Sequence, residues 1–206
     1  ERASFLYDGR PVLASIDLEV AEGECVGVVG RNSAGKSTLL ALAGGAMAPE
    51  SGTVARTPAT AGVLYLPQTP ERMFFAETVR EEIAFGLKLL PSHRGKGSQQ
   101  IDAVVEISLR TVGLDPAEVM ERPPFELSFG EMRRVAFAIA HAIAPDLLLL
   151  DEPASCLDRA GRDVLATLVA SRLDAGAAVV VASHDRTHLD DLCDRVLTLE
   201  DGRLRA

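Results

Sequence analysis

The chain has 206 residues, 47% of them hydrophobic and 25% charged, which is ordinary for a globular protein. This length allows one large domain, or a core domain that carries a smaller appended one. No apolar run approaches the roughly 20 residues of a transmembrane helix, and no signal-peptide pattern is visible at the N-terminus. The net charge of −9 argues against non-specific binding to DNA or RNA, since such binding relies on basic surface. Cys25, Cys156 and Cys193 match no zinc-binding spacing and indicate reduced thiols in a cytosolic protein.

Strand-sized segments predict an α/β core. Val12–Val20 alternates apolar and polar residues after a turn-like stretch, which predicts a half-buried antiparallel strand. Continuous apolar runs, typical of parallel strands covered on both faces, lie at Cys25–Val29, Leu147–Leu150 and Ala177–Ala182. Helical stretches lie between these runs, including Lys36–Ala43 and Val164–Leu173.

The middle of the chain differs in character. The helix-periodic segments Glu77–Leu90 and Ile101–Val112 are joined by a polar, glycine-containing stretch, in which we expect Ser92–Gln99 to be the most mobile loop. This pattern predicts a helical insertion. We therefore divide a single domain into an α/β core at 1–72 and 144–206, which includes the antiparallel part, and a helical subdomain at 73–143.

The segment Phe125–Ile143 predicts a further helix with two alternative roles. Ser128 and Glu131, placed three residues apart ahead of an apolar-periodic run, have the pattern of a capping box. The segment is then either a well-capped amphipathic helix and nothing more, or one half of a nucleotide site whose other half lies on a different chain.

The segment "GRNSAGKST" carries the strongest chemical signal. It matches G-x-x-x-x-G-K-[ST] and lies between an apolar strand and a helix, as this phosphate-binding pattern requires; a glycine-rich turn without a ligand is the alternative. Glycines let successive amides face a phosphate, Lys36 supplies charge to the β- and γ-phosphates, and the Ser37 hydroxyl is a ligand for Mg²⁺. The candidate nucleotide-binding residues of this loop are Gly30, Arg31, Asn32, Ser33, Ala34, Gly35, Lys36, Ser37 and Thr38.

Polar side chains follow two later strands. Asp151 and Glu152 follow Leu147–Leu150, and His184 follows Ala177–Ala182. Ligands bind at the carboxyl ends of strands in open α/β sheets. We expect Asp151 to hold Mg²⁺ through water, Glu152 to orient or deprotonate the attacking water, and His184 to donate a hydrogen bond to the γ-phosphate. Taken singly, an acidic pair also fits a strand end with a helix cap, and a lone histidine also fits a structural role.

These motifs occur in an order and spacing that resembles the nucleotide-binding subunits of ABC transporters over essentially the whole chain. "LSFGE" (Leu127–Glu131) lies where that family has its signature, usually LSGGQ. Gln68 in "YLPQ" matches the family's Q-loop, and "DEPASCLD" matches the segment that ends in the D-loop at Asp158. Tyr7 falls where the family places an aromatic ring against adenine.

The resemblance implies a P-loop NTPase core and an ATPase that uses ATP and Mg²⁺. Ser128, Gly130 and Asp158 would complete the ATP site of a second ATPase subunit, in a homodimer or a heterodimer. A transmembrane permease, contacted near Gln68 and Phe74–Phe85, would hold the protein at the cytoplasmic face of the membrane, and no nucleic acid is expected. The implied catalytic residues are Glu152, His184, Gln68 and Lys36, and the implied metal ligands are Ser37, Gln68 and Asp151.

Within the family, two stretches look most like the ATPases of energy-coupling factor importers, including their cobalt and nickel branch. These are "FFAETVREEIAFGL" and "ERPPFELSFGEMRRVAFA". Importers of this kind take up vitamins or metal ions. We expect no regulatory domain after the hairpin predicted at "EDGRL".

The chain departs from the family pattern at four positions. Ser33 stands where glycine is common in the phosphate-binding loop, and it is expected to be harmless if it keeps a negative φ. Cys156 replaces a glycine or alanine of the D-loop segment. Phe129 replaces the first glycine of the signature, and we expect it to be the first helical residue, with its ring packed on the insertion. Glu131 replaces a glutamine of similar size.

Two other functions compete with transport. A soluble ABC protein acting on nucleic acid or ribosomes is disfavoured by the acidic balance and by the lack of a long coiled coil between the motifs. A P-loop kinase of small molecules would need neither "LSFGE" nor the D-loop segment.

Overall fold

The computed structural model describes residues 1–56, 62–93 and 95–205. In chain order the strands are β1 (Ala3–Tyr7), β2 (Arg10–Ile16), β3 (Cys25–Val29), β4 (Val63–Leu66), β5 (Leu147–Asp151), β6 (Ala178–Ser183), β7 (Arg195–Glu200) and β8 (Arg203–Arg205). The helices are α1 (Lys36–Ala43), α2 (Val79–Leu89), α3 (Ser98–Thr111), α4 (Pro116–Val119), α5 (Phe129–Ile143), α6 (Arg159–Asp174) and α7 (Arg186–Leu192), with short 3₁₀ turns at Pro70–Arg72, Pro91–His93 and Pro124–Glu126.

The chain forms two compact units. The first comprises Glu1–Gln68, Pro145–Pro153 and Val169–Ala206, and the second comprises Thr69–Ala144 and Ala154–Leu168. Among the described residues, no helix is long and apolar enough to cross a membrane.

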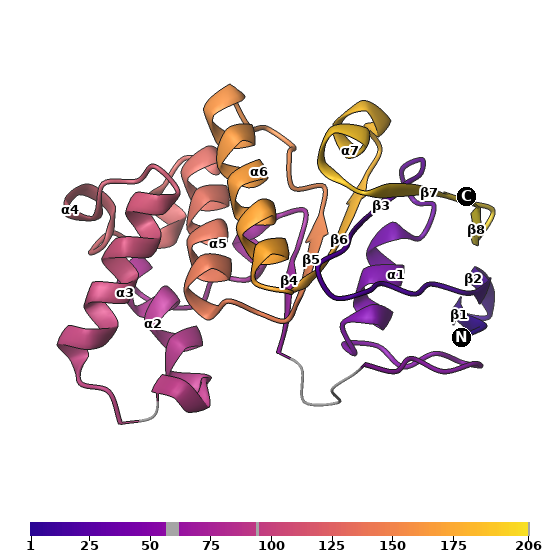
Figure 1. Cartoon of the computed structure of the whole chain (residues 1–206), viewed down its shortest axis with the longest axis horizontal. Coiled ribbons are helices and arrows are strands. Elements are labelled where there is room, and N and C mark those ends of the chain that lie inside the picture. Colours follow the sequence, from indigo (N-terminus) through magenta and orange to yellow (C-terminus); the bar gives the residue numbers. More distant parts are fainter. Residues whose placement is uncertain (57–61, 94, 206) are drawn as a thin grey trace. The chain divides into compact units, whose positions relative to one another are not determined.

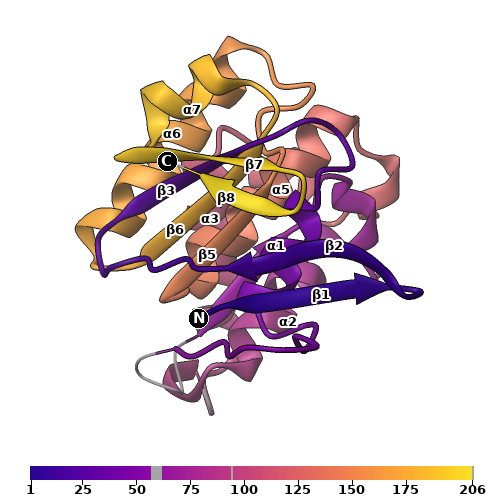
Figure 2. The same ribbon diagram turned by 90° about the vertical axis from the view of Figure 1, so that its right-hand side faces the viewer.

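The first unit contains both sheets (Figure 2). Its main sheet has six strands in the order β4-β5-β6-β3-β7-β8, in which only the β7–β8 pair is antiparallel. Strands β1 and β2 form a separate antiparallel pair. This arrangement, together with the helices of the second unit, confirms the predicted α/β class with a mostly parallel sheet and a small N-terminal antiparallel part.

Helices cover both faces of the main sheet in the first unit (Figure 1). Val28 of β3 is buried in a cluster with Leu39 and Leu40 of α1. The neighbouring Gly27 lies so close to α7 that a Cβ there would approach Leu189 Cβ to 3.2 Å. Successive strand residues face opposite sides of a sheet, so α1 and α7 cover opposite faces, as the uninterrupted apolar runs predict.

The predicted and observed strands differ most at β2. The sequence predicts a strand at Val12–Val20, whereas β2 spans Arg10–Ile16. Its partner explains the difference, because β1 pairs Tyr7 with Arg10 and Ala3 with Ile16, where the ladder ends. The predicted bounds of β3 and α1 agree with the structure.

The second unit is helical. Helices α2, α3 and α5 pack on one another around buried apolar side chains. Gly86 lets α2 and α5 approach closely, because a Cβ at this position would lie 2.6 Å from Ile143 Cδ1. Helix α3 begins at Ser98, inside the predicted loop Ser92–Gln99, and Arg94 of that loop lies outside the described residues.

Candidate active site

The phosphate-binding pattern forms the turn between β3 and α1 in the first unit. Gly35 has a φ of 101° and is the N-cap of α1, and no side chain caps the helix. A left-handed N-cap suits glycine, which has no Cβ to strain. The first amides of a helix have no partner inside it and carry its positive dipole end, so this turn is suited to an anion.

Ser33, in the same turn, does not meet the condition under which it would be a harmless replacement. Its φ is 65°, not negative. A non-glycine residue in the left-handed region is strained by about 1 kcal/mol relative to glycine, so the serine at this position is not conformationally neutral. Cys156, the other replacement at a glycine-like position, has a φ of 62°.

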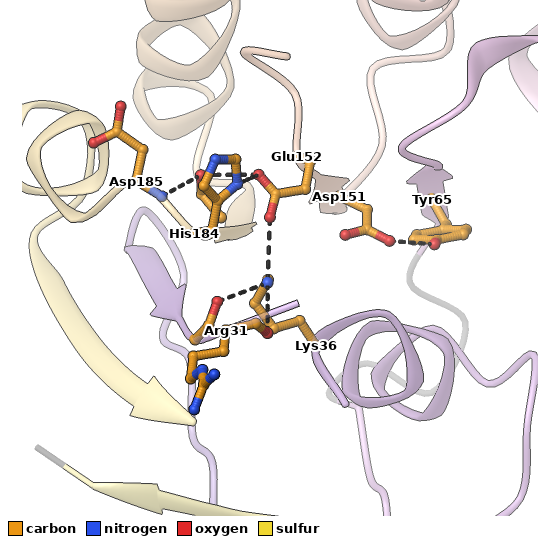
Figure 3. Close-up of polar contacts among 9 residues, drawn as sticks. Arg31, Lys36, Tyr65, Asp151, Glu152, His184 and Asp185 are labelled. Atoms are coloured by element: carbon orange, nitrogen blue, oxygen red, sulfur yellow. Dashed lines mark hydrogen bonds and ion pairs between the residues drawn. The ribbon is translucent and has the colours of Figure 1, made fainter. Parts of the chain in front are cut away.

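Lys36 lies at the centre of a buried set of contacts (Figure 3). Its Nζ donates hydrogen bonds to the carbonyl oxygens of Gly30 at 2.9 Å and Arg31 at 3.3 Å. The same atom is 3.2 Å from Glu152 Oε1, an ion pair whose side chains are only 7% and 6% exposed. The lysine and the acidic residue predicted to act on ATP are therefore adjacent and paired with each other.

Glu152 is held at the carboxyl end of β5 by neighbours from β6. Its amide donates to Ala182 O at 2.8 Å, and its Oε2 lies 2.9 Å from His184 Nδ1 (Figure 3). Ser183 Oγ donates to the same Oε2 at 3.1 Å, and it also accepts from the Asp185 amide at 3.1 Å. The sequence prediction missed Ser183, although it directly precedes His184 in "VVVASHD".

Asp151 is the last residue of β5 and is buried. Its Oδ2 accepts a hydrogen bond from the Tyr65 hydroxyl at 3.0 Å (Figure 3). Tyr65 belongs to β4, which pairs in parallel with β5. The sequence prediction missed this residue as well, although it stands in the "YLPQ" stretch that identifies Gln68.

A cavity of about 490 Å³ joins most of these residues in the first unit. Its lining is Val12, Asn32, Ser33, Gly35, Lys36, Ser37, Thr38, Gln68, Asp151 and Glu152. The structure thus brings the phosphate-binding turn, the acidic pair and the Q-loop glutamine to one place. The predicted nucleotide residues Gly30, Arg31, Ala34 and Tyr7 are not in the lining, and Tyr7 is 64% exposed on β1.

The donors in this cavity fit Mg²⁺ carried by phosphates. Ser37, Gln68 and Asp151 offer hydroxyl, amide and carboxylate oxygens, the ligand type that Mg²⁺ prefers. Among the described residues, no group of three or more His, Cys, Asp or Glu side chains forms a metal cage. Mg²⁺ is ordinarily held by one or two protein groups together with substrate phosphates, and the oxygen donors of this cavity suit such a cation.

The second unit contains the signature-like segment. Ser128 is the N-cap of α5, and the predicted capping box is confirmed: Glu131 N donates to Ser128 Oγ at 3.3 Å, and Ser128 N donates to Glu131 Oε2 at 2.8 Å. Ser128 Oγ also donates to Glu131 Oε2 at 2.7 Å. These hydrogen bonds from Ser128 hold the pKa of Glu131 below its ordinary value.

Phe129 is the first residue of α5, as predicted. Its ring lies under the guanidinium of Arg133, whose Cζ is 5.5 Å from the ring centroid, within the range of a cation–π contact. A Cβ at Gly130 would meet nothing within 4 Å, so the approach to this backbone is open.

A second cavity of about 500 Å³ lies in the second unit. Its lining includes Ser128, Gly130, Cys156 and Asp158. Asp158 accepts from the Gly161 amide at 2.7 Å and from Arg134 Nη2 at 3.2 Å, and the Gly161 bond is the main reason that its pKa is lowered. The predicted signature and D-loop residues thus line one surface.

The chain is similar to known proteins. The family model described as "ABC transporter" matches residues 13–155. A putative ABC transporter ATP-binding protein of Streptomyces coelicolor is 38% identical, over 98% of this chain and 79% of that protein. The energy-coupling factor transporter ATP-binding protein EcfA2 of Streptococcus sanguinis is 34% identical, over 94% of this chain and 73% of that protein.

The fold of the chain is also similar to that of a solved structure. The structure of cbiO1 from Clostridium perfringens, described as part of the ABC transporter complex cbiONQ, has a TM-score of 0.79 and 26% sequence identity, and the match covers 100% of this chain and 85% of that one. The family match spans the phosphate-binding turn, the signature-like segment and the acidic pair. The chain belongs to the ABC transporter family, as an ATP-binding and ATP-hydrolysing subunit.

Proposed function

We propose that this chain is the ATPase subunit of a membrane importer of the energy-coupling factor type, which takes up a vitamin or a metal ion. The observation that carries the ATPase part is the cavity shared by Lys36, Ser37, Gln68, Asp151 and Glu152. The transport class is supported by the similarity to the EcfA2 and cbiO1 proteins.

The turn before α1 binds the phosphates of ATP through its amides and Lys36. Ser37, Gln68 and Asp151 would hold Mg²⁺ with those phosphates, and the cation would supply charge neutralisation. Glu152 accepts a proton from water as the water oxygen bonds to the γ-phosphorus. The bond from that phosphorus to the bridging oxygen breaks, which gives ADP and phosphate.

The Lys36–Glu152 ion pair must loosen for this chemistry. While Glu152 Oε1 is paired with Lys36 Nζ at 3.2 Å, the ammonium occupies the side of the carboxylate that would otherwise face water. The phosphates of ATP are stronger anionic partners for Lys36 than a single carboxylate. ATP binding therefore frees one side of Glu152, while Ser183 and His184 continue to hold its Oε2.

A second ATPase subunit completes each site in this proposal. The lining of the second cavity, with Ser128, Gly130 and Asp158, is the surface that closes on ATP held by the partner's phosphate-binding turn. Closure on ATP and reopening after hydrolysis drive the transport cycle.

The membrane partner binds an aromatic surface of the second unit. Phe75 and Phe85 are 62% and 46% exposed and meet edge to face, with 4.7 Å between ring centroids. The buried Glu82 fixes this surface, because its Oε2 accepts from the amides of Phe75 and Ala76 at 2.9 and 2.8 Å. Exposed aromatic side chains on a fixed backbone are typical of interface anchors, and a permease at the cytoplasmic face of the membrane is the partner we propose.

Lys36→Ala tests the ATPase proposal. This change should abolish measurable ATP hydrolysis and weaken Mg-ATP binding, because the charge that faces the phosphates is lost. Lys96→Ala is the matched control, since Lys96 is exposed and lies outside both cavities. Hydrolysis by the Lys36→Ala chain at the rate of the control would exclude the site.

A photo-crosslinker at position 85 tests the transport proposal in cells that express the full chain. The expected product contains a membrane protein with several spans, identified by mass spectrometry. When Phe75→Asp is added to the same chain, this crosslinked product should no longer form. A product that contains a ribosomal protein or nucleic acid would favour the soluble alternative.

A further inference from the structure

Tyr65 forms a hydrogen bond with Asp151, although Tyr65 itself has no role in the motifs assigned so far. Strands β4 and β5 pair in parallel, with Tyr65 opposite Leu149. From this position the hydroxyl of Tyr65 reaches the end of β5 and donates to Asp151 Oδ2 at 3.0 Å (Figure 3). The two residues are 86 positions apart in sequence, so the contact is created by the pairing of the two strands.

Asp151 needs such a donor. The residue is only 3% exposed, and a buried carboxylate loses hydration that hydrogen bonds must replace. The carboxylate also rotates about a torsion with a broad energy minimum, so nothing intrinsic to aspartate fixes its plane. A phenol that donates to Oδ2 restricts that rotation and leaves Oδ1 available as an acceptor.

We propose that Tyr65 is a positioning residue of the ATPase site, which orients Asp151 for Mg²⁺ through its hydrogen bond to Oδ2; this inference rests on the role proposed above for Asp151. Mg²⁺ tolerates little departure from octahedral geometry, so the orientation of a carboxylate that holds its water ligands affects affinity. Partners behind metal ligands typically change metal affinity by about 10-fold or more when they are removed.

Tyr65→Phe is the test variant, because it removes the hydroxyl and keeps the ring. The measurement is equilibrium binding of a fluorescent ATP analogue in excess Mg²⁺ and in EDTA, in the Glu152→Gln background to prevent turnover. We expect the affinity gained from Mg²⁺ to fall about 3- to 10-fold, with affinity in EDTA unchanged. In the parental background, the Mg²⁺ concentration for half-maximal hydrolysis should rise by a similar factor, and kcat at saturating Mg²⁺ should change little.

Thr111→Val is the matched control. It also deletes a single hydroxyl, which donates to Ile107 O at 2.9 Å on α3 in the second unit. Its Mg²⁺ dependence should equal that of the parent chain. Thermal unfolding of each variant checks the fold, and a Tyr65→Phe chain that unfolds well below the parent would assign the hydroxyl to folding and overturn the proposal.

Combining Tyr65→Phe with Asp151→Asn shows whether the effect passes through Asp151. The tyrosine change should have no further effect on Mg²⁺ dependence once Asp151 is altered. An unchanged Mg²⁺ gain in Tyr65→Phe, or an equal loss of affinity in Mg²⁺ and EDTA, would refute the positioning role. If Asp151→Asn itself leaves the Mg²⁺ gain intact, the metal role in the proposed function fails separately.

Discussion

Helices α1 and α5 begin in different ways, although we propose that both N-termini face phosphate. Helix α1 follows Gly35, has no side-chain cap and has no acidic residue in its first turn. Helix α5 is capped by Ser128, with Glu131 in its first turn. The amides of the first N-terminus are therefore uncapped, and Lys36 beside them pairs with Glu152 from another element. The second N-terminus is capped by a carboxylate of its own helix, Glu131.

The difference indicates that the two helix N-termini bind phosphate with different strengths. An anion at α1 meets the positive helix end and Lys36, and it displaces Glu152 of β5 from Lys36. An anion at α5 competes with Glu131 for the Ser128 hydroxyl, which donates to Glu131 Oε2 at 2.7 Å. We infer that ATP binds first and more tightly at α1, and that contact with α5 is weaker and easily reversed, as a cycle of closing and opening requires.

Glu152→Gln should have the largest effect. The change keeps the shape of the side chain and removes the base, so ATP hydrolysis should fall by about 100-fold or more while binding persists. The ATP-closed dimer should then accumulate, which size-exclusion chromatography with and without Mg-ATP measures. Hydrolysis at the parental rate would remove Glu152 from the mechanism.

Ser128→Ala should have the second-largest effect, and it should lower ATP hydrolysis more than Phe129→Gly does. Loss of one hydroxyl that faces a charged phosphate is expected to lower steady-state hydrolysis by about 10-fold. Phe129→Gly should mainly lower stability, by about 1 kcal/mol or more, because the contact with Arg133 is lost and chain entropy is added.

Both variants are compared by ATP hydrolysis, in the full transporter if the isolated chain is inactive, and by thermal unfolding. A large gain in activity from Phe129→Gly, together with no effect of Ser128→Ala, would mean that Phe129 blocks the signature and that α5 does not reach phosphate.

Glu131→Gln should have the smallest effect, and it should strengthen the action of the signature rather than weaken it. Removing the negative charge from the start of α5 should tighten the ATP-dependent dimer by about 2- to 5-fold at neutral pH. Sedimentation in Mg-ATP with the Glu152→Gln change present measures this. A dimer weakened by Glu131→Gln would show that the capping box, rather than the charge, decides closure.

The pH dependence of stability gives a second test of Glu131. Ser128 lowers the pKa of Glu131 in the folded chain below its ordinary value of 4.5, so the ionised form stabilises the fold above that value. This contribution should be lost as the pH falls through the lowered pKa. The difference in unfolding temperature between the parent and Glu131→Gln should therefore shrink on acidification below pH 4.5.

The sequence predicts features that depend on adjacent residues. It does not predict contacts that arise from the pairing of strands far apart in the chain. The bounds of β3 and α1 follow from an apolar run, a glycine-rich turn and a helical pattern that adjoin each other. The capping box at Ser128 is equally local. Strand β4 has only four residues, and its place beside β5 depends on a partner far along the chain.

The same reasoning explains what was missed in the site. The contacts of Ser183 with Glu152 and of Tyr65 with Asp151 both cross between strands, so no short pattern reports them. The sign of φ at Ser33 was left open by the sequence, and the structure shows it to be positive. The path of the turn between β3 and α1 requires a positive φ at this position, and Ser33 adopts it although the conformation is strained for a serine.

Amide hydrogen exchange, followed by mass spectrometry in the Glu152→Gln chain, tests the contrast between the two helix ends most directly. With Mg-ATP at a protein concentration too low for dimers, exchange should slow in peptides covering Gly30–Thr38 and stay unchanged around Ser128–Glu131. Slowing at Ser128–Glu131 should appear only as the protein concentration is raised and the dimer closes. Equal protection of both segments in the monomer, or none at Gly30–Thr38 with saturating Mg-ATP, would contradict the account.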